Sequence, residues 1–367
     1  MLSCVYRLTA PGVFQEFREE VGFLQDKVLV CPTHLSICHA DQRYYQGLRP
    51  KEILKSRLPM ALIHEAAGMI LYDPKGEWKP GQKAVFIPNQ PRNEKKEWEK
   101  TKSEWVIEEN YQPEARFCGS STDGFLREIL TLSRDRILPL PDKVPLEIGA
   151  FTEMVSVAFH SIRRIKLDKE REKRGTALSI SVWGDGNLAY LTGLLLKYLY
   201  PAMRLDVFGV NQEKLEYFTF ADKTHHIDRI TGKEYEKGEE EFHFAFECVG
   251  GEASGTVIGE IIKKMNPEGR IALLGVSEYA VPIDTRTVLE KGLTLIGNSR
   301  SGREDFENVI RLYEEQEGII EALLPLVGEM LYVSSVKELS EAFERDEGRR
   351  WGKTILVKSS WVQENRI

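Results

Sequence analysis

The sequence contains few cysteines and no long hydrophobic run. Its five cysteines are scattered over 367 residues, which argues against a disulfide framework and favours a reducing compartment. The most apolar stretch, residues 188–200, is too short to cross a bilayer, which takes about 20 apolar residues. The first residues also lack the apolar core of a signal peptide. The sequence therefore predicts a cytoplasmic protein.

An excess of positive charge is also absent. Lys and Arg number 50 and Asp and Glu number 57, so the formal net charge is −7. This balance argues against a general binder of nucleic acids or of anionic membranes. An anionic substrate must then be recognised by a local basic pocket. The length of 367 residues is enough for roughly two globular domains.

Two patterns of secondary structure follow one another along the chain. The first is mostly strands and loops, with short apolar runs at residues 28–30 and 84–87 and a charge-dense excursion at residues 93–110. In the second, strands alternate with helices, which is typical of a parallel, doubly wound sheet. We expect strands at residues 178–183, 205–208, 242–248, 271–275 and 293–297, and helices at residues 188–200, 212–221 and 256–265.

A glycine-rich turn connects the first strand of the second pattern with the helix that follows. Gly184, Gly186 and Ala189 form a G-x-G-x-x-A motif. The first glycine permits a tight turn, the second lets the backbone approach a pyrophosphate, and the small alanine lets helix and strand pack closely. The helix that starts near Asn187 and Leu188 offers free N–H groups to the phosphates. The motif predicts a dinucleotide site.

The end of the next strand bears on the choice between NAD and NADP. NAD sites usually place an acidic residue about 20 residues after the glycines, where it binds the ribose 2′-hydroxyl. Gly209 stands at that position, and Asp206 comes too early because it lies within the strand. No carboxylate is then expected to repel a 2′-phosphate, and Lys214 is near. The sequence favours NADP over NAD.

Residues that commonly bind metals occur in order in the first pattern. Cys38, His64 with Glu65, and Glu153 supply a thiol, an imidazole and carboxylates. These are good zinc ligands, and a catalytic zinc needs three of them plus an open position. Each residue alone has an ordinary structural explanation, but their order upstream of a dinucleotide motif favours a zinc site. Asp41 is expected to accept a hydrogen bond from the ring of the ligand histidine.

Four motifs carry a family resemblance. They are C-H-A-D at residues 38–41, H-E-A-A-G at residues 64–68, T-E-M-V-S-V at residues 152–157, and the glycine motif. In this order they resemble the zinc-dependent medium-chain dehydrogenase/reductases, and T-E-M-V-S-V resembles the polyol branch of that family. Longer strings, such as C-H-A-D-Q-R-Y-Y at residues 38–45 and W-G-D-G-N-L-A-Y at residues 183–190, resemble the bacterial ribulose-5-phosphate reductases.

The resemblance implies an α/β chain of two domains. A GroES-like, β-rich catalytic domain would comprise residues 1–153 and 298–367, and a Rossmann domain with a doubly wound parallel sheet would comprise residues 154–297. It also implies zinc- and NADPH-dependent reduction of D-ribulose 5-phosphate to D-ribitol 5-phosphate. In the family, a cytidylyltransferase uses this product to make CDP-ribitol for teichoic acids or capsule. Family members are commonly homodimers or homotetramers, and residues 293–297 are a candidate edge strand.

The same resemblance implies roles for single residues near the metal. Cys38 and His64 would bind one catalytic zinc, with Glu65 and Glu153 as further ligands, directly or through water. The zinc would polarise the substrate ketone, and NADPH would supply the hydride. The proton that completes the reaction would come from a zinc-bound water, from His39 or from a cofactor ribose hydroxyl.

The substrate phosphate requires strong donors, and an arginine fork matches its oxygens. We expect Arg43 and Arg300 to bind it. The wider substrate set consists of Arg43, Tyr44, Tyr45, Arg300 and Arg303. The expected cofactor set consists of Gly184, Gly186, Asn187, Leu188, Ala189, Gly209, Asn211, Lys214, Gly275 and Val276.

Three positions depart from the family pattern. Residues 88–118 contain only Cys118 where many relatives hold a second zinc on four cysteines, so we expect no structural zinc. Ala40 replaces a Ser or Thr that relays a proton, which leaves the proton path open. Ile63 replaces the usual glycine before the ligand histidine, and we expect this change to affect only local packing.

Three alternatives stay open at this point. One is a zinc polyol or alcohol dehydrogenase that acts on an unphosphorylated sugar, and another is a zinc-free, quinone-reductase-like enzyme. The third is a non-catalytic relative that binds NADPH. The intact set of Cys38, His64, Glu65 and Glu153 argues against the third, because a sensor has no need of metal ligands.

Overall fold

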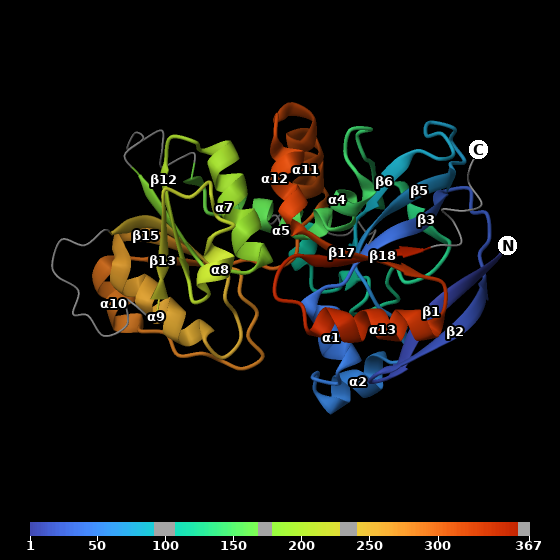
Figure 1. Ribbon diagram of the computed structural model, residues 1–367, viewed down its shortest axis with the longest axis horizontal. Coiled ribbons are helices and arrows are strands. Elements are labelled where there is room, and N and C mark those ends of the chain that lie inside the picture. The colour runs from blue at the N-terminus through green and yellow to red at the C-terminus, as the bar shows by residue number, and fades with distance from the viewer. Residues whose placement is uncertain (92–106, 168–177, 228–240, 359–367) are drawn as a thin grey trace, which may run out of the picture. The chain divides into compact units, whose positions relative to one another are not determined.

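The computed structural model describes residues 1–91, 107–167, 178–227 and 241–358. The chain divides into two compact units, shown in Figure 1: unit 1 consists of Met1–Ser156 and Arg300–Ile367, and unit 2 of Val157–Ser299. The limits of the units differ by a few residues from the expected domain bounds. The charged excursion expected at residues 93–110 lies mostly outside the described residues. Among the described residues, no helix is both long enough and apolar enough to span a membrane.

Strand β3 (Lys27–Ser36) is the centre of the larger sheet in unit 1. It pairs antiparallel with β5 (Glu65–Tyr72), β9 (Leu130–Ser133) and β18 (Lys353–Lys358). Because β18 comes from the C-terminal segment, that segment completes the sheet that the N-terminal strands begin. The remaining strands of this sheet are β6 (Lys83–Phe86) and β10 (Ile137–Pro139) beyond β5, and β17 (Val327–Val333) beyond β18.

Smaller elements complete unit 1. One sheet has the order β2 (Val13–Glu20), β1 (Leu2–Ala10), β4 (Met60–Ala61), and a two-stranded sheet pairs β7 (Asn89–Gln90) with β8 (Arg116–Phe117). The described α-helices that belong to this unit or begin in it are α1 (His39–Tyr45), α2 (Lys51–Arg57), α4 (Leu146–Ala150), α5 (Thr152–Arg164), α11 (Arg303–Glu315), α12 (Ile319–Leu323) and α13 (Val336–Glu347). Short 3-10 turns lie at Glu109–Tyr111, Arg134–Arg136 and Leu324–Leu326.

An aromatic cluster fixes helix α1 to the rest of unit 1. Phe14 of β2, Tyr45 of α1 and Phe343 of α13 lie with ring centroids 4.9 to 5.6 Å apart. All three side chains are buried, and such contacts stabilise a fold beyond the area that they bury. The cluster therefore anchors the C-terminal end of α1, whose other end begins at Cys38.

Unit 2 contains a six-stranded, fully parallel sheet. Its strands run in the order β13 (Lys223–His226), β12 (Arg204–Gly209), β11 (Ser179–Trp183), β14 (Phe242–Glu247), β15 (Met265–Leu273), β16 (Thr294–Gly297). The chain runs outward from β11 to one edge and then from β14 to the other, which is the doubly wound topology of a dinucleotide-binding fold. The described helices of the unit, besides most of α5, are α7 (Asn187–Leu199), α8 (Gln212–Leu215), α9 (Ser254–Lys264) and α10 (Thr285–Lys291). The predicted fold class is confirmed.

The helix expected at residues 212–221 is wrong in its length, because α8 ends at Leu215. The residues that follow include aromatic and β-branched side chains, which have low helix propensity. Phe218 and Phe220 instead pack against Tyr190 of α7, with ring centroids 5.5 and 5.2 Å away. Tertiary packing therefore ends the helix early. Strand β15 also begins earlier than expected, at Met265.

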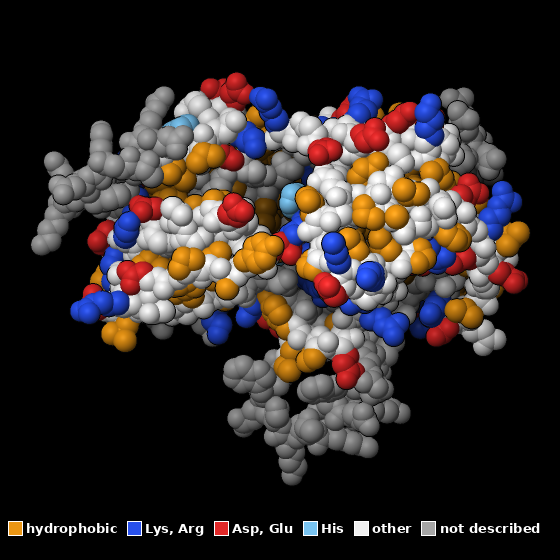
Figure 2. Space-filling view, turned by 90° about the horizontal axis from the view of Figure 1, so that it is seen from below, with side chains coloured by type: hydrophobic (Ala, Val, Ile, Leu, Met, Phe, Trp, Pro, Cys, Tyr) orange, Lys and Arg blue, Asp and Glu red, His pale blue; other side chains and the backbone are white. Residues whose placement is uncertain are grey.

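Charged side chains of both signs are interspersed on the face of the molecule that Figure 2 shows. On the face shown in Figure 2, Lys and Arg side chains lie among Asp and Glu side chains. This distribution agrees with a small net charge of −7 on 367 residues. Recognition of an anion by this chain therefore requires a local site.

Lys358, the last residue of β18, is a buried cation in unit 1. Its side chain is 3% exposed, and its Nζ atom has no hydrogen-bond partner in the described part of the chain. The Nζ atom lies 4.9 Å from the ring centroid of Tyr6, in a small pocket also lined by Leu126 and Leu339. Burial lowers the pKa of Lys358 to about 8, although Glu128 opposes the shift. Folding therefore disfavours the protonated form of this group.

This burial predicts a stability that rises with pH above about 8. An unfolded lysine has a pKa of about 10.4, so between pH 8 and 10 the unfolded chain binds more protons than the folded one. We expect Lys358→Met to raise the free energy of unfolding at pH 7 by about 3 kcal/mol and to remove the rise above pH 8. Urea denaturation from pH 7 to 10 measures both effects. Lys55→Met, at an exposed position, is the control, and equal behaviour of the two variants would contradict the assignment.

Candidate metal and cofactor sites

Asp41 joins the two loops that carry the predicted metal ligands. Cys38 is the N-cap residue of α1, and its N–H donates to Oδ2 of Asp41 at 3.0 Å. The N–H of Ile63, directly before His64, donates to Oδ1 of the same carboxylate at 2.9 Å. Asp41 is fully buried, and burial raises its pKa while His64 and the two backbone N–H groups lower it. One carboxylate therefore sets the distance between Cys38 and His64.

Ile63 has a left-handed backbone conformation, with φ of 70°. This region costs a β-branched residue of the order of 1–3 kcal/mol and costs glycine almost nothing. Hydrogen bonds hold the residue in place, because its N–H donates to Asp41 and its carbonyl accepts from the N–H of Phe125 at 2.7 Å. The expectation that replacing the usual glycine affects only local packing is therefore wrong. The replacement also places strained backbone next to His64.

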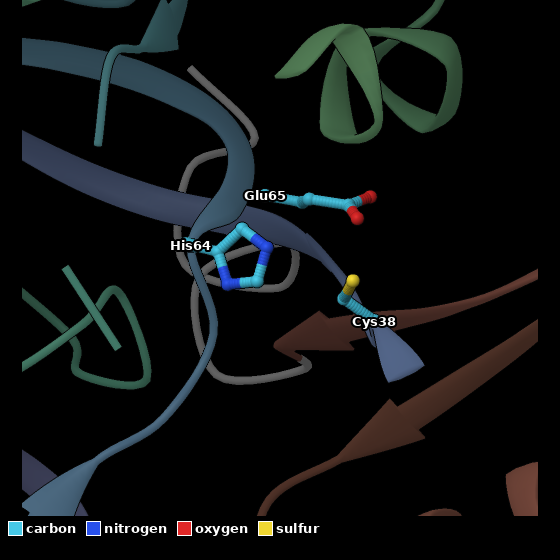
Figure 3. Close-up of side chains that lie close together, drawn as sticks. All are labelled: Cys38, His64 and Glu65. Atoms are coloured by element: carbon cyan, nitrogen blue, oxygen red, sulfur yellow. The ribbon is translucent and has the colours of Figure 1, made fainter. Parts of the chain in front are cut away.

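The side chains of Cys38, His64 and Glu65 converge in unit 1. Figure 3 shows these three side chains close together. The thiol sulfur, a ring nitrogen and a carboxylate oxygen lie within 4.8 Å of one another. Burial lowers the pKa of His64, but the opposing effects of Cys38, Asp41 and Glu153 are larger and raise it to about 10. The negative groups that stabilise a proton on the buried imidazole of His64 would also stabilise a bound metal cation. Sulfur, imidazole and carboxylate donors fit zinc.

Both oxygens of Glu65 have partners within the protein. The ammonium of Lys353 donates to Oε1 at 2.9 Å, and the hydroxyl of Ser36 donates to Oε2 at 2.7 Å. Lys353 is 3% exposed and Glu65 fully buried, so this is a buried ion pair. Ser36 faces Glu65 across the β3–β5 pair, and Lys353 begins β18. The sequence analysis missed both partners, since neither stands in a recognisable motif with Glu65.

Glu153 lies beside this group rather than within it. It is in the first turn of α5 and 7% exposed, and the compact group of potential ligand atoms consists of Cys38, His64 and Glu65. Burial raises the pKa of Glu153, the charge of Glu65 adds to the shift, and His64, Lys353 and Arg300 oppose it. Glu153 therefore responds to the charges at the cluster, and its role as a ligand stays a prediction.

Asp41 does not play the expected role toward the histidine ring. The distance from Nδ1 of His64 to Oδ1 of Asp41 is 3.9 Å, which is too long for a hydrogen bond. The carboxylate of Asp41 instead accepts hydrogen bonds from the backbone N–H groups of Cys38 and Ile63. The predicted hydrogen bond from the ring of His64 to Asp41 is therefore wrong. His39 is exposed at the first position of α1. Desolvation of its ring by the surrounding protein atoms and the positive charges of Arg43 and Arg49 lower the pKa of His39.

Arg300 lies one aromatic ring away from the metal-ligand cluster. Its guanidinium carbon is 4.4 Å from the ring centroid of Phe117, and that ring lies 5.3 Å from the ring of His64. Burial lowers the pKa of Arg300, while Glu153 and Tyr44 oppose the shift. In the described part of the chain, no carboxylate pairs with this guanidinium. The Tyr44 hydroxyl donates to the carbonyl of Ser120 at 3.3 Å.

Two residues of the expected substrate set have other functions. Tyr45 belongs to the buried aromatic cluster, and its hydroxyl donates to the carbonyl of Ser340 at 3.4 Å. Arg303 donates to Glu307 at 2.7 Å and to the carbonyl of Asp135 at 2.6 Å. Tyr45 therefore stabilises the core, and Arg303 fixes the start of α11. We remove both from the substrate set. Arg43 lies on α1 and donates to the carbonyl of Leu48 at 3.4 Å.

The glycine motif of unit 2 has the geometry of a phosphate-binding turn. Gly184 has φ of 132°, and its N–H donates to the carbonyl of Phe208 at 2.8 Å. Ala189 is buried, and its Cβ is 3.4 Å from where a Cβ of Gly184 would stand. Nothing lies within 4 Å of a Cβ built on Gly186. The turn therefore leaves open space in front of α7, which starts at Asn187 with Leu188 next.

The buried carboxylate of Glu247 orders the two loops that follow β14 and β15 in unit 2. Glu247 ends β14, and its Oε1 accepts from the N–H groups of Val249 and Gly250, each at 2.9 Å. Its Oε2 accepts from the N–H of Gly275 at 3.0 Å. The Gly275 N–H is therefore not available to a cofactor, although Val276 is 72% exposed. The sequence analysis missed Glu247.

Comparisons with known proteins show the family to which the chain belongs. Residues 24–142 match the family model of the alcohol dehydrogenase GroES-like domain, and residues 198–315 match that of a zinc-binding dehydrogenase. The chain is 43% identical to ribulose-5-phosphate reductase 1 of Staphylococcus aureus, over 99% of this chain and 100% of that protein. It is 42% identical to the ribulose-5-phosphate reductase of Bacillus spizizenii, over 97% and 99%. The crystal structure of S. aureus TarJ in complex with NADPH superimposes with a TM-score of 0.83 at 39% identity, covering 98% of this chain and 99% of that one.

The buried pair of Lys353 and Glu65 predicts a strong effect of removing the ammonium. In the metal-free protein, Lys353→Met removes the ammonium that pairs directly with the buried Glu65 carboxylate, so we expect the free energy of unfolding to fall by about 3–5 kcal/mol. A divalent cation can replace the lost charge, so zinc should restore more stability in the variant than it adds to the parent protein. Thermal unfolding with and without zinc measures both. The exposed pair of Lys337 and Glu341 supplies the control, because Lys337→Met should cost less than about 1 kcal/mol. If Lys353→Met were as stable as Lys337→Met, the claim that Lys353 compensates the charge of Glu65 would be refuted.

Proposed function

We propose that this chain, which belongs to the zinc-dependent medium-chain dehydrogenase/reductases, reduces D-ribulose 5-phosphate to D-ribitol 5-phosphate with NADPH. Its identity of 43% over 99% of the chain to a ribulose-5-phosphate reductase supports both the membership and the substrate. The observation that carries the proposal is the position of Arg300, one aromatic ring from the group of Cys38, His64 and Glu65. The guanidinium of Arg300, which could bind a phosphate, thus lies beside the residues that could bind a metal ion.

The residues of unit 1 fit one zinc ion. Zinc bound there would polarise the substrate ketone and stabilise negative charge on its oxygen. Cys38 and His64 would hold the ion, with Glu65 and Glu153 as further ligands, directly or through water. Lys353 keeps the charge of Glu65 compensated, so the cluster does not depend on the metal alone for its neutrality. The two backbone hydrogen bonds of Asp41 fix the loops that carry Cys38 and His64 relative to each other.

The residues of unit 2 fit NADPH. When bound, NADPH supplies the hydride, and the protein supplies orientation and charge. The turn of Gly184 and Gly186 would accept the pyrophosphate, since it leaves open space before the N-terminus of α7. The end of β12 at Gly209 would accept the adenosine ribose, with Asn211 and Lys214 following it. The crystal structure of TarJ with NADPH supports this cofactor.

Arg300 would bind the substrate phosphate. Its guanidinium can donate two parallel hydrogen bonds to phosphate oxygens, and stacking on Phe117 restricts where it can lie. Arg43 and Tyr44, which lie on α1, stay in the substrate set. For the proton that completes the alcohol, we propose His39. It directly follows Cys38, and Ala40 has no hydroxyl to relay a proton.

Finer parts of the proposal concern the setting of the reaction. We place the enzyme in the cytoplasm, in agreement with its scattered cysteines. The product would pass to a cytidylyltransferase that makes CDP-ribitol for teichoic acid or capsule synthesis. The chain would form a homodimer or homotetramer, and β16 at one edge of the parallel sheet is the strand that could join two copies.

The proposal predicts a substrate preference that depends on phosphate, metal and cofactor. With NADPH and zinc, we expect ribulose 5-phosphate to be reduced at least about tenfold more efficiently than ribulose, because the charged contact to Arg300 is lost without the phosphate. NADH should be the poorer cofactor, and chelation of zinc should abolish turnover. Absorbance at 340 nm follows each reaction. Equal rates with both sugars would favour a polyol dehydrogenase, and full activity after chelation would exclude zinc chemistry.

Arg300 predicts a separate effect on substrate and cofactor. Arg300→Met removes the guanidinium, so we expect KM for ribulose 5-phosphate to rise at least about tenfold while the Kd for NADPH stays within about twofold. Arg303→Met is the matched control, since that guanidinium already pairs with Glu307, and it should leave both constants near those of the parent protein. Steady-state kinetics and a fluorescence titration with NADPH give the two constants. Parallel loss of both ligands in Arg300→Met would refute the assignment.

A further inference from the structure

Asp185, in the middle of the glycine motif, places a carboxylate beside the end of β12. Its Oδ2 accepts from the N–H groups of Val210 and Asn211, each at 2.8 Å. Only 13% of its side chain is exposed. A charged acceptor with two backbone donors forms strong hydrogen bonds. The carboxylate therefore ties the turn after β11 to the loop after β12.

Asp185 also explains why glycine stands at position 209. A Cβ on Gly209 would lie 2.8 Å from the Cβ of Asp185 and 2.9 Å from a side-chain carbon of Leu215. An acidic side chain at position 209, where NAD sites usually carry one, would collide with both. The absence of that acid thus follows from packing as well as from cofactor choice. The carboxylate of Asp185 still lies next to position 209, but Asp185 belongs to the turn after β11 and not to the end of β12.

The hydrogen bonds of Asp185 extend to Lys214. Asn211, whose N–H donates to Asp185, accepts at its own Oδ1 from the N–H of Lys214 at 3.0 Å and so caps the short helix α8. The Nζ atom of Lys214 lies 4.0 Å from Oδ1 of Asp185. Asp185 therefore fixes both the backbone that carries Lys214 and the region where its ammonium lies.

We infer that Asp185 is a positioning residue that holds the β12–α8 loop and Lys214 ready for the 2′-phosphate of NADPH. The inference rests on the proposed function, because it takes NADPH as the cofactor. The ribose 2′ group of a dinucleotide is recognised at the end of the second strand of this fold, and β12 is that strand. The carboxylate of Asp185 accepts hydrogen bonds from the N–H groups of Val210 and Asn211 and lies beside the ammonium of Lys214. It therefore does not serve as the acceptor for a ribose hydroxyl.

If Asp185 bound the ribose of NADH instead of positioning the loop, replacing it would change the affinity for NADPH in the opposite direction. If its carboxylate accepted hydrogen bonds from an NADH ribose, it would also repel a 2′-phosphate. Neutralising it would then weaken NADH binding and strengthen NADPH binding. If it positions the loop, neutralising it removes charged acceptors from two N–H groups and weakens NADPH binding most. The sign of the change in NADPH affinity therefore separates the two roles.

The test is direct binding of NADPH and NADH to Asp185→Asn. We expect Kd for NADPH to rise about tenfold, the effect of losing a charge-assisted hydrogen bond, and Kd for NADH to change by less than about threefold. Fluorescence titration gives both constants without turnover, and thermal unfolding checks that the variant is folded. An NADPH affinity that is unchanged or increased overturns the inference. If the parent protein binds neither cofactor, the proposed function fails instead.

Two further variants make the test specific. Lys214→Met should weaken NADPH about tenfold and leave NADH unchanged, and adding Asp185→Asn to it should cost little more, because Asp185 acts through Lys214. Full additivity overturns the inference. Unchanged NADPH affinity in Lys214→Met also overturns it, and that variant can be tested even if Asp185→Asn does not fold. Glu247→Gln is the matched control, since Glu247 also binds backbone N–H groups after a strand. It should weaken both cofactors equally.

Discussion

The buried carboxylate of Asp41 is the constraint on which the metal site depends. It accepts from the backbone N–H of Cys38 with one oxygen and from that of Ile63 with the other. Because these N–H groups belong to the loops that carry Cys38 and His64, the carboxylate holds the two loops together and so brings the two ligand side chains close to each other. The strained conformation of Ile63 is part of this arrangement, since its N–H must point at Asp41. A neutral side chain at position 41 would leave two buried N–H groups without charged acceptors.

Several carboxylates among the described residues order loops by accepting hydrogen bonds from backbone N–H groups, and Asp41, Asp185 and Glu247 do so next to the candidate sites. Asp41 does so in unit 1, and Asp185 and Glu247 do so after strands of the parallel sheet in unit 2. Each accepts from backbone N–H groups on a segment next to a candidate site. Backbone donors are fixed by the fold and lose little entropy when they are bound, so a carboxylate that engages them yields a rigid loop. Glu65 differs, because its partners are the side chains of Ser36 and Lys353.

Local patterns revealed the parts of the molecule that depend on neighbours in the sequence. The G-x-G-x-x-A turn was predictable, because the tight turn at Gly184 and the close packing at Ala189 are local requirements. The approach of Cys38, His64 and Glu65 was predictable from residue types in a known order. Lys353 was not, because it lies 288 residues from Glu65 and only the pairing of β18 with β3 brings them together. Tyr45 and the end of α8 were misjudged for the same reason, since tertiary packing of aromatic rings decided both.

X-ray absorption at the zinc K edge of the purified, metal-loaded protein tests the central claim most directly. The arrangement of Cys38, His64 and Glu65 predicts one zinc ion per chain with one sulfur neighbour at about 2.3 Å and nitrogen and oxygen neighbours at about 2.0–2.2 Å. Replacing Cys38 by serine should remove the sulfur shell and leave the lighter neighbours. A zinc ion with oxygen neighbours alone in the parent protein, or a sulfur shell that survives the loss of Cys38, would contradict it.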